Sequence, residues 1–140
     1  MNIVAIGGGE IRERETLAID QWIVRLTKKR KPRALFVPTA SGDAQGYCET
    51  FDNIYGEELG CKTDHLLLLS NDRDAKQIEK KVLGADVIYV GGGNTLRMMK
   101  LWRKLGVVEP ILCLPLELRG RNEAREEADD AFADILSRNL

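Results

Sequence analysis

Short apolar runs alternate along the chain with segments whose apolar residues recur at helical spacing. Four runs have the length and composition of buried strands: residues 2–6, 34–38, 63–68 and 86–90. Helix-period segments follow them at about 13–27 and 47–59, then from a cap at Asp72 or Asp74 through Val82, and then at about 96–105. This alternation is typical of βαβ units, so we predict an α/β domain of three layers (α/β/α) with four parallel strands.

The alternation ends after Gly106. Residues 111–118 are apolar but contain Pro115, which removes a ladder donor, so we expect an edge-like or irregular fifth element there. Residues 122–138 have the pattern of one amphipathic C-terminal helix.

Composition places the chain among ordinary globular domains. It has 140 residues, 44% hydrophobic and 31% charged, with a net charge of −1. These values exclude wholesale disorder and give no global reason to expect nucleic acid or membrane binding. Cys48, Cys61 and Cys113 are odd in number and widely spaced, and the N-terminus has no signal-peptide pattern. We expect a cytoplasmic protein without a metal site or cofactor.

Two glycine triplets follow predicted strands, at residues 7–9 and 91–93. Carboxyl ends of parallel strands meet at the edge where α/β domains bind ligands. Glycines there let backbone N–H groups face an anion, and the second triplet also opens a helix with an electropositive N-terminus. The triplets predict a loop for a phosphate or an oxyanion, or else a tight turn without a ligand. Neither matches the dinucleotide or P-loop fingerprint.

Three motifs stand in order along the chain: IVAIGGGE at 3–10, FVPTASGD at 36–43 and IYVGGGNT at 88–95. Together they resemble the N-terminal half of the peptidase E family of serine peptidases, which includes aspartyl dipeptidase and cyanophycinase. The resemblance covers about residues 1–110. Residues 111–140 are then a divergent tail of a single domain that spans residues 1–140.

The resemblance implies a flavodoxin-like sheet, related to that of class I glutamine amidotransferases and truncated here after the fourth strand. It implies hydrolysis of small peptides, typically after aspartate, by acyl transfer. It also implies that Gly93 gives an oxyanion-hole N–H, with Asn94 beside it. The candidate oxyanion and substrate-binding residues are Gly8, Gly9, Ser41, Gly92, Gly93, Asn94 and Thr95.

One part of the family pattern is missing. The family's nucleophile lies on a G-x-S-A-G elbow, on the strand after the helix that matches 96–105, and the strained elbow needs its flanking glycines. No G-x-S-A-G occurs in the sequence, the one serine after Gly106 is Ser137, and the single histidine is His65. We therefore assign no catalytic residue and expect an inactive chain. The alternative is a non-catalytic dimeric scaffold, or a module that binds a small anion or nucleotide through the two glycine loops.

Other reactive side chains have simpler interpretations. We expect Ser41 to stabilise its loop or contact substrate, and His65 to be structural. Cys48 is interpreted as a packed residue at a helix start, although a helix N-terminus can lower the pKa of a thiol. The cations of residues 25–33 are interpreted as a solvated helix end.

The family's sheet continues past the fourth strand, and this chain lacks the matching sequence. We therefore expect an uncovered apolar sheet edge. The helix at 122–138 has a narrow, alanine-rich stripe that buries little area. We therefore expect a homodimer through about residues 107–136, with twofold symmetry. The acidic residues of 117–140 would pair there with the cations of 28–33. A small peptide or anion is the other expected partner.

Overall fold

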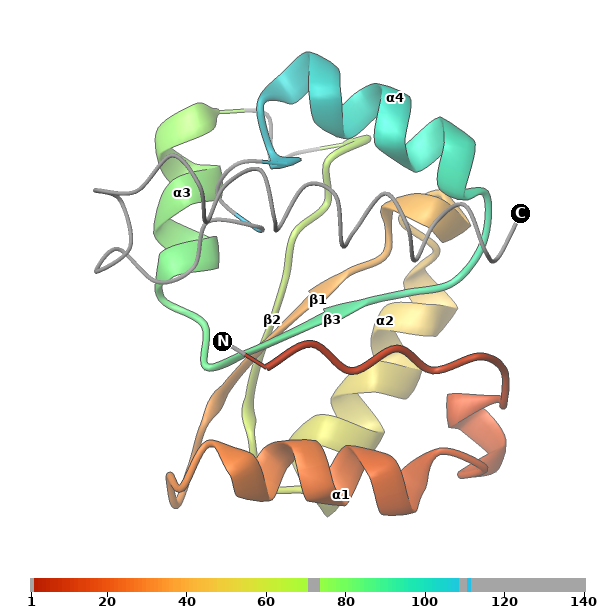
Figure 1. The fold of residues 1–140 in the computed structure, drawn as a ribbon, viewed down its shortest axis with the longest axis vertical. Coiled ribbons are helices and arrows are strands. Elements are labelled where there is room, and N and C mark those ends of the chain that lie inside the picture. Colours follow the sequence, from red (N-terminus) through yellow and green to blue (C-terminus); the bar gives the residue numbers. More distant parts are fainter. Residues whose placement is uncertain (1, 71–73, 109–110, 112–140) are drawn as a thin grey trace.

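The computed structural model describes residues 2–70, 74–108 and 111. Within them β1 (Arg33–Val37) lies between β2 (Lys62–His65) and β3 (Val87–Val90), and both strand pairs are parallel. The structure is therefore an α/β fold with a parallel sheet of three strands, which confirms three of the four predicted strands (Figure 1).

Helical elements connect the strands. They are η1 (Ile11–Glu13), α1 (Leu17–Leu26), η2 (Thr39–Ser41), α2 (Gln45–Phe51), its π-helical continuation η3 (Asp52–Glu58), α3 (Ala75–Leu83) and α4 (Thr95–Leu105). Local chemistry fixes their ends: Asp74, one of the two caps predicted for α3, accepts the N–H groups of Lys76 and Gln77 on its Oδ1 at 2.8 and 3.2 Å. The first helix begins at Leu17 instead of 13, because Arg14 adopts a left-handed conformation (φ 61°) that ends η1.

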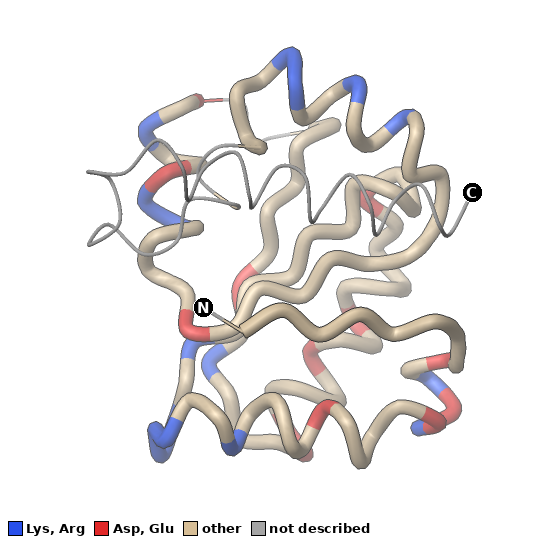
Figure 2. Tube along the Cα trace, viewed as in Figure 1, with Lys and Arg blue, Asp and Glu red and all other residues tan. Residues whose placement is uncertain are grey.

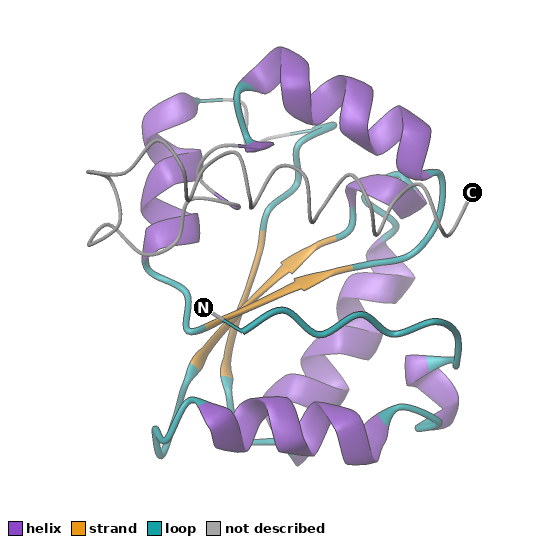
Figure 3. Ribbon diagram, in the orientation of Figure 1, coloured by secondary structure: helices purple, strands orange, loops and turns teal. Residues whose placement is uncertain are grey.

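Helices cover both faces of the sheet (Figure 3). Alternate side chains of a strand point to opposite faces. Leu35 and Val37 accordingly pack in a cluster with side chains of α3 and α4. Ala34 and Phe36 pack in a second cluster with side chains of α2 and η3.

α1 is held to the second face by a polar contact. Asp20 is the one buried side chain of α1 and is 0% exposed. Its carboxylate accepts the hydroxyl of Thr16 and the hydroxyl of Tyr55, both at 2.8 Å. Two hydroxyl donors thus satisfy a buried acid that has no cation partner among the residues described.

The prediction of a strand at residues 2–6 is wrong. These residues run beside β3 in the same direction, but as an irregular segment without a strand partner (Figure 3). Among the described residues, no backbone hydrogen bond joins 2–9 to another part of the chain. A strand requires a ladder, and an open cleft separates this segment from β3.

β2 is shorter than predicted. It ends at His65 instead of 68, with one further ladder bond from Leu66 N–H to Phe36 O at 2.8 Å. β1 stops at Val37, and the Pro38 carbonyl turns away to accept Ser41 N–H at 3.0 Å. Beyond Val37, β1 therefore offers no backbone with which β2 could continue to pair.

The expected element at 111–118 and helix at 122–138 lie outside the described residues, apart from Ile111. In the described part of the chain, no helix is long and apolar enough to cross a bilayer.

Candidate functional site

A cleft of about 1760 Å³ lies between residues 2–10 and β3, and we call it the β3 cleft. Both glycine triplets line it: residues 7–9 at the carboxyl end of segment 2–6, and residues 91–93 at the carboxyl end of β3. Of the residues predicted for the site, those that line the cleft are Gly8, Gly9, Gly92, Gly93 and Thr95. Ser41 and Asn94 are not among its described lining residues.

Gly93 lies where the loop after β3 meets the loop after β1. Its φ is +139°, and a Cβ on it would stand 2.3 Å from the carbonyl oxygen of Ala40. Asn94 N–H donates to that same oxygen at 2.8 Å. Two backbones in direct contact leave no room for a side chain, so only glycine fits at this position.

The N-terminus of α4 opens at this loop. Asn94 caps it, because its Oδ1 accepts Arg97 N–H at 2.9 Å. The backbone N–H groups of Gly92 and Gly93 have no hydrogen-bond partner in the described residues, and both glycines are exposed. Free N–H groups beside a helix N-terminus form a site for a negative charge.

Positive charge accompanies this loop. α4 carries four cations (Arg97, Lys100, Arg103 and Lys104) and no acid, and Figure 2 shows Lys and Arg along its outer side. Arg97 lies in the first turn, close in sequence to the free N–H groups. The potential at the mouth of the loop therefore favours an anion.

Ser41 is turned into its own loop. Its Oγ donates to Pro38 O at 2.8 Å, and the side chain is half-buried. A hydroxyl in this arrangement stabilises the 3-10 turn η2.

His65 and Cys48 lie on the α2 side of the sheet. His65 Nε2 is 3.1 Å from Asp52 Oδ1, and its ring lies edge-on to Phe36. Burial, reinforced by the carboxylates of Asp52 and Asp43, raises the pKa of the Cys48 thiol. Cys48 is buried in α2, which confirms its interpretation as a packed residue, and burial with the nearby acids outweighs the effect of the helix N-terminus on its pKa.

The sequence did not predict a group of tyrosines at the cleft. Tyr47, Tyr55 and Tyr89 all line it. Burial raises the pKa of Tyr89, with Tyr47 and Asp20 adding to the shift, and burial and the bond to Asp20 raise the pKa of Tyr55. Both stay neutral at physiological pH. The three tyrosines come from three separate segments of the sequence, and only the fold brings them together.

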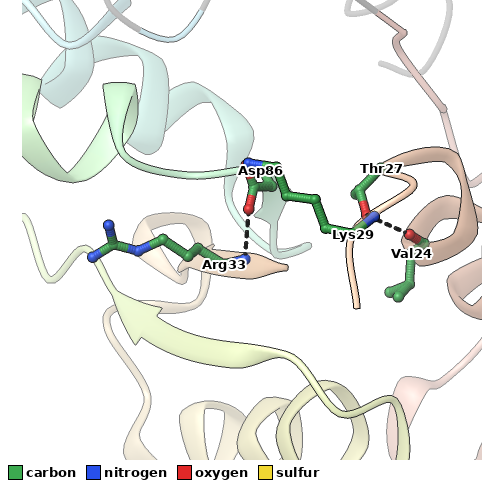
Figure 4. A network of polar contacts seen from close by, with 5 residues as sticks. All are labelled: Val24, Thr27, Lys29, Arg33 and Asp86. Carbon is green, nitrogen blue, oxygen red and sulfur yellow. Dashed lines mark hydrogen bonds and ion pairs between the residues drawn. The ribbon is translucent and has the colours of Figure 1, made fainter. Parts of the chain in front are cut away.

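A polar network joins the amino ends of β1 and β3 (Figure 4). Asp86 Oδ2 accepts Arg33 N–H at 2.9 Å, and Asp86 Oδ1 accepts Lys29 Nζ at 2.6 Å. Burial opposes ionisation of Asp86, yet the Arg33 N–H and the Lys29 ammonium hold its pKa below the usual value. Lys29, in the cationic stretch, thus has a partner within the domain.

No group of three or more His, Cys, Asp and Glu side chains that could hold a metal ion occurs in the part of the chain that the structure describes. The chemistry that the cleft offers is backbone hydrogen bonding to an anion or oxyanion.

Comparison with known proteins gives two matches and one absence. The family model described as "Peptidase family S51" matches residues 3–114. A protein of Bacillus subtilis (strain 168), named "Uncharacterized peptidase YgaJ", is 40% identical over 106 residues, which are 75% of this chain and 45% of the relative. The chain thus spans less than half the length of this curated relative. No solved structure matches. With the family model matched from the first predicted strand to beyond α4, the chain belongs to peptidase family S51.

Proposed function

We propose that this chain carries the oxyanion- and substrate-binding part of a serine-type acyl-transfer site, and that it does not hydrolyse peptides by itself. The observation that carries the proposal is the pair of free N–H groups at Gly92 and Gly93, on a cleft and beside the N-terminus of α4. Such donors stabilise the oxyanion of a tetrahedral intermediate. The related Bacillus protein is named a peptidase, and the substrate class proposed here is a small peptide cleaved after aspartate.

Acyl transfer also needs a nucleophile and a base. No G-x-S-A-G elbow occurs in the chain. Ser41 donates its hydroxyl to Pro38 O, and His65 contacts Asp52 away from the described lining of the cleft. Without a nucleophile, only the oxyanion-hole and binding contributions to the rate are left.

The test is labelling of the purified chain with a fluorophosphonate, together with an assay of aspartyl-dipeptide hydrolysis. An active serine hydrolase in the same reaction controls the probe. We expect neither labelling nor hydrolysis. Stoichiometric labelling of one serine would overturn the inactive interpretation, and loss of that label in Ser41→Ala would identify the residue.

A second candidate function is binding of a small anion or nucleotide. It is favoured by the presence of both glycine triplets on one cleft. Titration calorimetry with inorganic phosphate and with a nucleotide tests it. Gly92→Asp is the informative variant, because a Cβ there meets nothing within 4 Å, so the variant adds negative charge without a clash. Binding that Gly92→Asp abolishes would favour this function.

The proposed state of the whole protein is a cytoplasmic homodimer with a flavodoxin-like sheet. The interface proposed at about 107–136 lies outside the described residues beyond Ile111. Light scattering during size exclusion measures the mass directly. A mass of 15.7 kDa that persists at high concentration would contradict the dimer.

A further inference from the structure

We propose that the outer side of α4 binds the acidic side chains of a peptide whose acyl group lies at the loop of Gly92 and Gly93. This side carries Arg97, Lys100, Arg103 and Lys104, and we call it the α4 basic face. The link to the loop rests on the proposed function. The binding of acidic side chains rests on α4 alone.

The four cations share one side of the helix. Residues three and four apart in an α-helix are neighbours on its surface, and the cations recur at these intervals from Arg97 to Lys104 (Figure 2). All four are exposed, whereas Met98, Met99 and Trp102 are buried in the core. The apolar side therefore anchors α4 to the sheet and leaves the basic face open to a ligand.

The cations of the basic face have no acidic partner in the described part of the chain. Their side chains take part in none of its ion pairs or hydrogen bonds, and α4 contains no Asp or Glu. α3 differs, since it includes Glu79, and its Lys81 pairs with Asp64. Like charges at helical spacing repel one another, so an anionic ligand relieves this repulsion as well as pairing with the cations.

The basic face begins at the loop that offers the free N–H groups. Arg97 lies in the first turn of α4, and its own N–H donates at 2.9 Å to Asn94, the residue after Gly93. Leu96, which is 61% exposed, lies between the loop and this first cation in the sequence. A peptide whose carbonyl oxygen accepts the loop N–H groups therefore has its neighbouring residues within reach of the basic face.

The spacing of the cations suits an extended peptide. Lys100 and Lys104 are about 6 Å apart along the helix axis, because each residue rises about 1.5 Å. In an extended chain, side chains on the same side recur about every 6.8 Å. Acidic residues at alternate positions of a peptide can therefore meet successive cations of the basic face.

A peptide fits this face better than a nucleic acid or a membrane does. Single-stranded nucleic acids stack their bases on aromatic rings, and the one aromatic residue of α4, Trp102, is 1% exposed. A helix that lies in a membrane surface turns its apolar side to the lipid, and that side of α4 is in the core. Acidic side chains need only the cations.

The experiment measures the binding of a fluorescent peptide of alternating Asp and Ala to the full chain, by anisotropy at low salt. We expect saturable binding that weakens as salt is raised, because salt screens exposed charges. A variant that combines Arg97→Gln, Lys100→Gln and Lys104→Gln should bind about tenfold more weakly, since three exposed pairs are lost. A peptide of alternating Asn and Ala should not bind.

The matched control removes the same charge from another part of the chain. Lys28→Gln, Arg30→Gln and Lys31→Gln change three exposed cations in the loop after α1, a helix on the opposite face of the sheet from α4. Binding by this variant should stay within about twofold of the parent chain. Far-UV circular dichroism checks that both variants fold.

Three outcomes would overturn the proposal. One is equal weakening by both variants, because the peptide would then respond to net charge alone. Another is no binding of the Asp-Ala peptide. The third is tighter binding of an oligothymidylate of equal charge that the α4 substitutions abolish, because the basic face would then be a nucleic-acid site.

Gly92→Asp separates this inference from the proposed function. It adds an acid to the loop without a clash, because a Cβ there meets nothing within 4 Å, and it leaves every cation of α4 in place. Weaker peptide binding in Gly92→Asp and in the α4 variant supports both proposals. Weakening by the α4 variant alone supports the basic face and contradicts the loop as the site of the acyl group. Weakening by Gly92→Asp alone contradicts the basic face.

Discussion

β1 and residues 2–6 have similar sequences and different structures. β1 reads Arg-Ala-Leu-Phe-Val and residues 2–6 read Asn-Ile-Val-Ala-Ile, both short apolar runs. β1 has β2 on one edge and β3 on the other, and its residues 34–37 are at most 2% exposed. Ile3 in the other segment is 52% exposed and has no ladder. The difference teaches that backbone pairing with a neighbouring strand, more than local composition, decides whether an apolar run becomes a strand.

The sharpest test of this contrast compares alanine substitutions in the two runs. Phe36 is 0% exposed and stacks on Phe51 with ring centroids 4.8 Å apart. Phe36→Ala should lower the free energy of unfolding by about 3–5 kcal/mol, through lost burial and the cavity left behind. Ile3→Ala should change it by less than about 0.5 kcal/mol. Urea denaturation measures both. A large cost for Ile3→Ala would show that residues 2–6 pack in solution as tightly as β1.

Gly93 and Gly8 allow a similar comparison between two loops, the one after β3 and the one after residues 2–6. Gly93 and Gly8 have φ values of +139° and +132°, so alanine is strained at both. At Gly93 the Cβ would also meet Ala40 O at 2.3 Å, whereas at Gly8 it meets nothing within 4 Å. Gly93→Ala should therefore cost about 1–3 kcal/mol more than Gly8→Ala, through overpacking. Thermal and urea denaturation of the two variants check this difference. Equal costs would mean that the loops after β1 and β3 are not in contact.

The smallest expected effect concerns the charge that ties β1 to β3. The lowered pKa of Asp86 means that its contribution is fully present above its unfolded pKa, about 3.9, and is lost as pH falls through the folded value. Asp86→Asn should cost about 1 kcal/mol or less at pH 7, because Lys29 is 59% exposed and solvent screens the pair. It should also flatten the decline in stability below pH 4. The exposed Glu57→Gln is the control and should leave the acid profile unchanged.

Particular residues explain what the sequence could predict. Proline at 38 and glycine at 91 bound apolar runs that pair as expected, and Asp74 caps its helix as expected. The run at 2–6 has the same local signal, but whether its backbone pairs with another strand depends on the tertiary fold, which no local pattern encodes. The edge-like strand and the dimer expected from the tail stay predictions.

The candidate site, too, was predicted only in part from the sequence. The glycine triplets carry a backbone signal, and both reach the cleft. Asn94 and Ser41 were grouped with them by sequence, but their side chains bond to Arg97 N–H and Pro38 O of their own loops. Tyr47, Tyr55 and Tyr89 come from three different elements, so their meeting at the cleft requires the tertiary fold.

The buried carboxylate of Asp20 has a consequence for how α1 finds its position. The α1 side chains that pack against the second cluster are Leu17, Ile23 and Val24. Apolar contacts of this kind are non-directional and discriminate little between offsets of one helical turn. Only one offset brings Asp20 within reach of the Tyr55 hydroxyl, and every other offset buries an acid against carbon. The carboxyl group therefore selects the register of α1 on the sheet. Asp20→Leu should then let α1 occupy several positions, visible as multiple NMR signals for the indole N–H of Trp22, and should lower stability because the buried Tyr55 hydroxyl loses its partner.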